Sequence, residues 1–218
     1  MSRQDEIAEN LEKVKAKIAA VATHEVTLIA VTKTFPVSDV QILHQLGVTN
    51  FGENRDIEGT EKSKVVPGTW HFQGQIQGNK LKSISTWASI IHSLDKTRHF
   101  ELIEKVAPHR IDIFLQVSLA AADHRGGANV ADLYALAARV ENSMTHTLYG
   151  LMAVPPLAMD QETAYLRLAQ IHQDFMKDFP KARSLSAGMS GDYELAILHG
   201  ATHVRIGSSI LGSRSSHM

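Results

Sequence analysis

The sequence predicts an α/β protein, a single (β/α)₈ TIM barrel with one extra helix in front of the first strand. Eight short apolar runs alternate with longer amphipathic segments, a pattern typical of strands that are each followed by a helix. The length of 218 residues suits such a barrel, since undivided folds of this kind run to roughly 200–250 residues. No linker or change in composition divides the chain. We therefore expect one domain over residues 1–212 and a disordered tail over 213–218.

The individual elements are predicted from local periodicity. The first helix rests on apolar residues at helical spacing with charges between them: Ile7, Leu11, Val14, Ile18 and Val21. The predicted strands are residues 26–32, 49–52, 69–72, 90–92, 112–117, 147–152, 183–186 and 202–206. The predicted helices between them are residues 39–46, 58–65, 79–86, 96–107, 131–142, 162–178 and 192–199. Glycines at 47, 150 and 200 mark helix ends or strand starts.

Composition narrows the possible functions. A net charge of -1 and interspersed basic residues provide no positive surface for nucleic acid, so we expect none as a partner. The absence of cysteine excludes disulfides, thiolate catalysis and thiolate-bound metals. The first ten residues are too charged for a signal peptide, and no apolar run reaches the roughly 18 residues needed to cross a bilayer. We expect a cytoplasmic protein.

Two segments point to chemistry at the carboxyl ends of the strands, where barrels place their active sites. Lys33 closes the apolar run Leu28-Ile-Ala-Val-Thr-Lys33 and is the only lysine that directly follows a predicted strand. The late segment Val204-Arg-Ile-Gly-Ser-Ser-Ile-Leu-Gly212 is a strand that breaks into a turn of small residues, whose backbone N–H groups suit a phosphate. An amine and a phosphate cradle together suggest pyridoxal 5'-phosphate, bound covalently at Lys33.

Other predicted strands also end in polar residues. These segments are Phe51-Gly-Glu-Asn54, Trp70-His-Phe-Gln-Gly74, His92-Ser-Leu-Asp95 and Ser186-Ala-Gly-Met-Ser190. Each has an alternative reading: His71 and His92 as hydrogen-bonded core histidines, Asn54 as a helix cap, and the late glycines as ordinary turn residues. No metal-binding spacing accompanies the histidines, so the sequence predicts no metal site.

Six ordered motifs carry a family resemblance that covers nearly the whole chain. They are Ala30-Val-Thr-Lys-Thr34, Phe51-Gly-Glu-Asn54, Trp70-His-Phe-Gln-Gly-Gln-Ile-Gln-Gly-Asn-Lys80, Gly150-Leu-Met152, Leu185-Ser-Ala-Gly-Met-Ser190 and Val204-Arg-Ile-Gly-Ser208. These motifs resemble the pyridoxal phosphate homeostasis protein family, whose barrels are similar to the N-terminal domain of alanine racemase. The resemblance implies that Lys33 forms the Schiff base and that Arg205 faces the pyridine nitrogen. It also implies further cofactor-binding residues: Ser190, Gly207 and Ser208 at the phosphate, and Asn54 and His71 in the pocket wall.

The chain departs from the family pattern in two places. Arg55 and Ile57 stand where the family usually has Tyr and Gln, and residues 120–127 replace a stretch in which Lys usually precedes Ser-Gly. Neither departure touches the lysine, the arginine or the phosphate residues, so the expectation of cofactor binding is unaffected.

The chemistry of Arg205 favours binding over catalysis. Pyridoxal phosphate withdraws electrons best when its ring nitrogen is protonated. A guanidinium has only donors and stays charged, so Arg205 beside that nitrogen would disfavour protonation. Racemisation also needs a second acid–base group, and none of the tyrosines follows a predicted strand: Tyr134, Tyr149, Tyr165 and Tyr193.

Three functions follow from these expectations. The favoured one is a monomer that holds pyridoxal 5'-phosphate as an internal aldimine, serves vitamin B6 homeostasis and releases the cofactor to pyridoxal phosphate-dependent apoenzymes. The alternative is an amino-acid racemase of low activity with a different second base. The third is a Schiff-base aldolase without cofactor, in which the late turn would bind a sugar phosphate.

Overall fold

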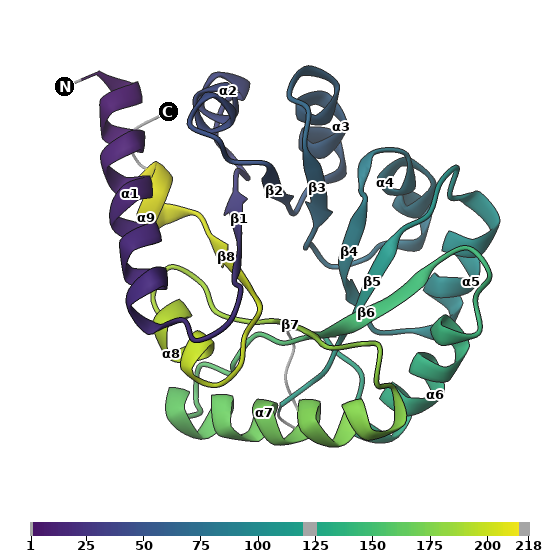
Figure 1. Ribbon diagram of the computed structural model, residues 1–218. Helices are drawn as coiled ribbons and strands as arrows, with labels where there is room; N and C mark the ends of the chain where they lie inside the picture. The colour runs from purple at the N-terminus through teal and green to yellow at the C-terminus, as the bar shows by residue number, and fades with distance from the viewer. Residues whose placement is uncertain (1, 120–125, 214–218) are drawn as a thin grey trace.

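Eight parallel strands close into a barrel in the order in which they occur along the chain, with β1 pairing with β8 (Figure 1). The computed structural model describes residues 2–119 and 126–213. The strands are β1 Thr27–Val31, β2 Asn50–Glu53, β3 Thr69–Phe72, β4 Ile90–Leu94, β5 Asp112–Gln116, β6 Thr147–Met152, β7 Ser184–Ser186 and β8 His203–Ile206. The predicted barrel is therefore confirmed.

Helices follow the strands around the outside of the barrel (Figure 1). They are α1 Arg3–Val21, α2 Val37–Gln45, α3 Asp56–Val65, α4 Leu81–Trp87, α5 Thr97–Val106, α6 Val130–Glu141, α7 Gln161–Asp178, α8 Tyr193–Leu198 and α9 Ser208–Leu211. A 3₁₀ turn, Gly78–Lys80, precedes α4. The predicted 213–218 tail lies outside the described residues except for Ser213, and so does most of the divergent 120–127 segment.

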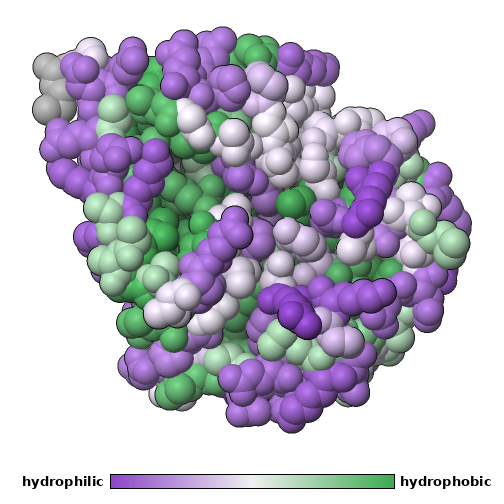
Figure 2. Space-filling view, in the orientation of Figure 1, coloured by the Kyte–Doolittle hydropathy of each residue, from purple (hydrophilic) through white to green (hydrophobic). Residues whose placement is uncertain are grey.

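The extra helix α1 packs against α8 and α9, the last two helices of the barrel (Figure 1). It begins with a capping box, in which Ser2 and Asp5 each accept the other's backbone N–H. Its buried stripe is made by Ile7, Leu11, Val14 and Ile18, as the periodicity predicts. On the face seen in Figure 2, hydrophobic residues form a band beside α1, and hydrophilic residues cover most of the remainder.

Strand β4 extends two residues beyond its predicted end. Residues 90–92 were expected from apolar character alone, whereas the strand continues to Leu94 with every side chain buried. His92 and Ser93 tolerate this burial because each has a hydrogen-bond partner inside the fold, Ser186 for His92 and the Gly74 carbonyl for Ser93. The polarity of a strand residue is therefore no sign of its exposure here.

Candidate functional site

Six of the seven predicted site residues line one cavity of about 280 Å³ at the carboxyl ends of the strands. They are Lys33, Asn54, Ser190, Arg205, Gly207 and Ser208. Further lining comes from apolar residues such as Val31, Phe35, Met152 and Val154. Such a cavity, apolar with a few convergent polar groups, has the size and character of a site for one small molecule.

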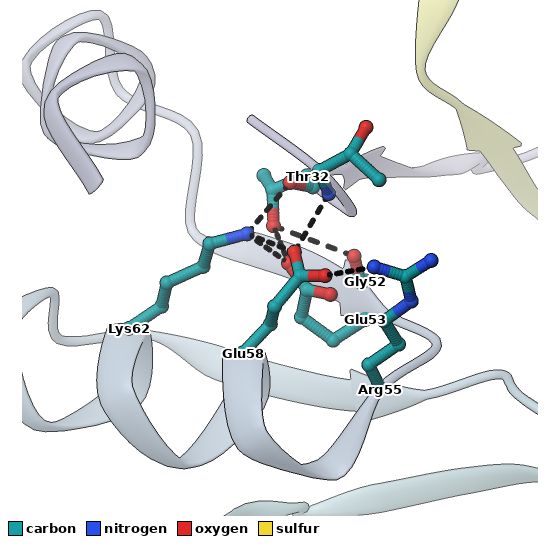
Figure 3. Close-up of polar contacts among 7 residues, drawn as sticks. Thr32, Gly52, Glu53, Arg55, Glu58 and Lys62 are labelled. Atoms are coloured by element: carbon teal, nitrogen blue, oxygen red, sulfur yellow. Dashed lines mark hydrogen bonds and ion pairs between the residues drawn. The ribbon is translucent and has the colours of Figure 1, made fainter. Parts of the chain in front are cut away.

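The backbone around Lys33 is held by two side chains of α3 (Figure 3). Lys62 Nζ donates to the carbonyl oxygen of Thr32 at 2.7 Å, and Glu58 Oε2 accepts the N–H of Thr34 at 2.6 Å. Glu58 and Lys62 lie one helical turn apart and pair at 2.9 Å. The residues on both sides of Lys33 are thus tied to the same helix face.

We call these contacts of Glu58 and Lys62 the clamp, and they hold a strained backbone conformation. Thr34 has a φ of 69°, in the left-handed region that a β-branched residue seldom adopts. A residue held there costs on the order of 1–3 kcal/mol, so the surrounding contacts must fix it. The bond from Thr34 to Glu58 is one such contact, and its effect is to set the direction in which Lys33 leaves the strand.

A buried carboxylate completes the clamp beneath the turn. Glu53, at the end of β2, is fully buried and accepts from both Lys62 Nζ and Thr32 Oγ1 at 2.6 Å. Burial raises the pKa of Glu53, although Lys62 opposes the shift. For Glu58 burial acts in the same direction, but the bonds to Lys62 and to the Thr34 N–H outweigh it and lower its pKa. Both carboxylates therefore depend on the Lys62 ammonium.

Sequence reasoning missed this clamp. Glu53 belongs to the motif Phe51-Gly-Glu-Asn54, but the sequence indicates Glu58 and Lys62 only as members of the predicted helix 58–65. The available signal was their i, i+4 spacing, which places opposite charges on one helix face.

The turns after β7 and β8 meet at the cavity. Ser190 Oγ accepts the N–H groups of Gly207 and Ser209 at 3.3 and 3.2 Å, and Ser209 Oγ donates to the Ser190 carbonyl at 3.2 Å. Because its oxygen already accepts two N–H groups, the Ser190 hydroxyl has its proton to offer as a donor. A side chain at position 207 would begin 3.1 Å from the Val31 carbonyl oxygen, so glycine lets this turn pack on β1.

Arg205 is a buried cation in the cavity wall. Its guanidinium donates to Ser186 Oγ at 2.7 Å and to the Ala153 carbonyl at 3.1 Å, and both of these partners are neutral. Burial lowers the pKa of Arg205 to about 10, so the side chain is charged at neutral pH. The site therefore places a fixed positive charge beside the small-molecule cavity.

The seventh predicted residue, His71, lies elsewhere. It is fully buried within the barrel, bonded to His92 and Asn50, and it is not among the residues that line the cavity. Its position fits the alternative reading of a core histidine. For Asn54 the alternative reading does not fit, because Arg55 holds the N-cap position of α3 while Asn54 lines the cavity.

The described residues show neither a metal-binding cluster nor a membrane-spanning helix. Within residues 2–119 and 126–213, no group of three or more His, Asp or Glu side chains is arranged to hold a metal ion. In the same part of the chain, no helix combines the length and the apolar character needed to span a membrane.

The barrel belongs to the class of alanine racemase N-terminal domains, whose family model matches residues 3–215. The chain is 35% identical over 243 residues to the pyridoxal phosphate homeostasis protein of Mycobacterium tuberculosis, covering 97% of this chain and 94% of that one. It is 33% identical over 232 residues to the protein of the same name from Escherichia coli K12, covering 96% and 97%. The chain belongs to the pyridoxal phosphate homeostasis protein family.

A solved structure agrees with this placement. PipY of Synechococcus elongatus PCC7942, with pyridoxal phosphate bound, superposes with a TM-score of 0.85 at 28% identity. The match covers 94% of this chain and 100% of PipY.

Proposed function

We propose that this protein binds pyridoxal 5'-phosphate covalently through Lys33 and serves the homeostasis of that cofactor, holding it and releasing it to pyridoxal phosphate-dependent apoenzymes. The observation that carries the proposal is that Lys33 lines the same cavity as Ser190, from the turn after β7, and Gly207, from the turn after β8. When bound, the cofactor supplies an aldehyde that condenses with a primary amine. The clamp on Thr32 and Thr34 would present the Lys33 amine to it in one direction.

The cavity residues from the turns after β7 and β8 fit the phosphate. The Ser190 hydroxyl, oriented by the N–H groups of Gly207 and Ser209, has a proton to donate, and Ser208 lines the cavity next to it. Donors of this kind, grouped in a turn of small residues, suit an anionic ligand. Ser190, Gly207 and Ser208 would therefore hold the phosphate, and Asn54 would contribute to the cavity wall.

Arg205 favours storage over turnover. A guanidinium near the ring nitrogen offers only hydrogen-bond donors, so it disfavours a proton on that nitrogen and weakens the electron withdrawal that catalysis needs. None of the four tyrosines, all within the described residues, lines the cavity, so none is placed as a second acid–base group. These features support a binding role. We further propose that the protein acts in the cytoplasm as a monomer.

Borohydride reduction of the cofactor-loaded protein, followed by peptide mapping, tests the proposal. We expect the wild-type protein to absorb near-visible light, as an internal aldimine does, and to carry the pyridoxyl label on Lys33. Lys33→Ala should lose the band, whereas Lys177→Ala, on the exposed side of α7, should keep it. A label on another lysine, with Lys33 unmodified, would overturn the assignment. An assay of amino-acid α-proton exchange in deuterium oxide separates this function from a racemase of low activity.

A further inference from the structure

A hydrogen-bonded series of polar side chains crosses the barrel interior from Arg205 to Asn50, and all of its members are buried except the half-buried Asn50. Arg205 Nη1 lies 2.7 Å from Ser186 Oγ, which lies 2.8 Å from His92 Nδ1. His92 Nε2 lies 2.9 Å from His71 Nδ1, and His71 Nε2 lies 3.0 Å from Asn50 Oδ1. The five residues come from β8, β7, β4, β3 and β2. Since β4 and β7 are not neighbours in the sheet, the bond between His92 and Ser186 spans the inside of the barrel.

The protons in this hydrogen-bonded series have one consistent arrangement. Arg205 can only donate, so Ser186 Oγ accepts from it. The acceptor Asn50 Oδ1 at the other end requires each neutral histidine to donate from Nε2, so Ser186 gives its own proton to His92 Nδ1. His92 then carries its proton on Nε2 and donates to His71 Nδ1. His71 in turn carries its proton on Nε2 and donates to Asn50 Oδ1, which can only accept. Every bond runs in the same direction, away from Arg205.

Burial keeps both histidines in the neutral form that this arrangement requires. Burial, with a smaller effect of His203, lowers the pKa of His71 to about 3. Burial also lowers the pKa of His92 well below its ordinary value, and the charge of Arg205 acts in the same direction. A second cation beside Arg205 is therefore disfavoured. This hydrogen-bonded series is also a poor proton conductor, because the guanidinium at one end does not act as an acid near neutral pH and the amide oxygen at the other does not act as a base.

We infer that Ser186 and His92 are positioning residues that fix the orientation of the Arg205 guanidinium through hydrogen bonds in the barrel interior. The bond to Ser186 and the bond to the Ala153 carbonyl engage both terminal nitrogens of the guanidinium, so its plane is set by the protein before any ligand enters. Through Arg205, the two residues would then influence the ring nitrogen of the cofactor. This last step rests on the proposed function, whereas the fixing of Arg205 does not.

Two pairs of substitutions separate the hydrogen bonds from packing. Ser186→Ala removes the hydroxyl, and Ser186→Thr retains it. His92→Phe keeps a ring that can stack on Phe114, which lies 4.4 Å from His92 between ring centroids. His92→Gln loses the ring but can still accept from Ser186 and donate to His71. If fixing Arg205 depends on hydrogen bonding, Thr and Gln should resemble the wild type, and Ala and Phe should not.

Nitrogen-15 NMR of the ligand-free protein tests the inference without the cofactor. We expect His71 and His92 to be neutral with the proton on Nε2 between pH 8 and pH 6. We also expect the Arg205 guanidinium protons to exchange with solvent at least tenfold faster in Ser186→Ala and His92→Phe than in the wild type, Ser186→Thr and His92→Gln. Equal exchange rates in all five proteins, or a proton on Nδ1 of His92 in the wild type, would overturn the inference.

The absorption spectrum of the loaded protein tests the link to the cofactor. Ser186→Ala and His92→Phe should shift the near-visible band and its pH dependence, while Ser186→Thr and His92→Gln restore both. Melting temperatures identify any variant that is merely less stable. Failure of the wild type to bind pyridoxal phosphate would contradict the proposed function, while the NMR result would still decide whether Ser186 and His92 fix Arg205.

Discussion

Lys62 on α3 donates a hydrogen bond to the carbonyl oxygen of Thr32 at 2.7 Å, so a buried ammonium holds the residue that directly precedes Lys33. The same ammonium forms ion pairs with both Glu53 and Glu58. The end of β1 is therefore shaped by a helix that lies after the next strand of the chain.

Lys62→Met should lower the free energy of unfolding by about 3–5 kcal/mol, because it leaves the buried Glu53 carboxylate without its cation. Adding Glu53→Leu should recover much of the loss, since an apolar pair avoids the buried charge. Urea unfolding measures both changes. Lys177→Met is the matched control: its ion pair with Asp174 is exposed, so the expected loss is under about 1 kcal/mol. Equal losses for Lys62→Met and Lys177→Met would contradict the role given to the clamp.

Glu58→Gln should act more on cofactor loading than on stability. The amide can still accept the N–H of Thr34, but it loses the charge that pairs with Lys62. We expect slower formation of the near-visible band in stopped-flow mixing with pyridoxal phosphate, by several-fold, because Lys33 is less firmly presented. Glu162→Gln, on the far helix α7, should load at the wild-type rate. A wild-type loading rate in Glu58→Gln would show that the ion pair with Lys62 is not needed to hold the turn at Lys33.

Ser190→Ala should weaken cofactor retention by about 1.5–3 kcal/mol, the range for a hydrogen bond to a charged group. Dissociation measured by transfer to an excess of apoenzyme should then be roughly ten- to a hundredfold faster. Ser208→Ala should act in the same direction.

Ser143→Ala provides the matched control for Ser190→Ala. The Ser143 hydroxyl also accepts two backbone N–H groups, those of Thr145 and His146, but it stands in the turn before β6. Ser143→Ala should lower the melting temperature without changing the retention of the cofactor. Similar retention in Ser190→Ala and Ser143→Ala would move the phosphate site elsewhere.

Acidification should destabilise the fold through its buried histidines. Burial lowers the pKa of His71 to about 3 and that of His203 to about 4. The unfolded chain therefore binds more protons than the folded one below the ordinary pKa of about 6.5. The stability is fully present above that value and is lost as the pH falls from about 6.5 toward 3. Each such histidine contributes roughly 1.4 kcal/mol per pH unit in that window.

His203→Phe tests the acid prediction, because it removes one titrating group while keeping a ring against Phe114 and Tyr149. The free energy of unfolding, measured by urea between pH 7.5 and 4.5, should fall less steeply by about 1.4 kcal/mol per pH unit. Thr202→Val removes the side-chain partner of His203 and keeps the ring, so it should lower stability with little change in slope. An unchanged slope in His203→Phe would rule out this histidine as a source of acid sensitivity.

The fold could be predicted because each strand and helix has a local sequence pattern, either an apolar run or helical periodicity. Six cavity residues could be predicted for a related reason: in a barrel, residues that follow the strands converge at one end. The clamp could not, since the contact of Lys62 with Thr32 depends on how closely α3 packs against β1 and β2. His71 illustrates the same limit. Its position after a tryptophan in β3 does not reveal that His92 reaches it from β4 and engages Ser186 across the barrel.

The bonded side chains of His71, His92 and Ser186 also give the cavity a floor. All three are fully buried, the bond between His92 and Ser186 spans the barrel interior, and Ser186 also accepts from Arg205 in the cavity wall. Because the interior of such a barrel is a packed core and not a pore, the described residues leave a ligand in the cavity no passage to the opposite end. Entry and exit would share one mouth, at the carboxyl ends of the strands. An acceptor that takes the cofactor directly would have to approach that mouth, and a molecule bound over it would slow uptake and release alike.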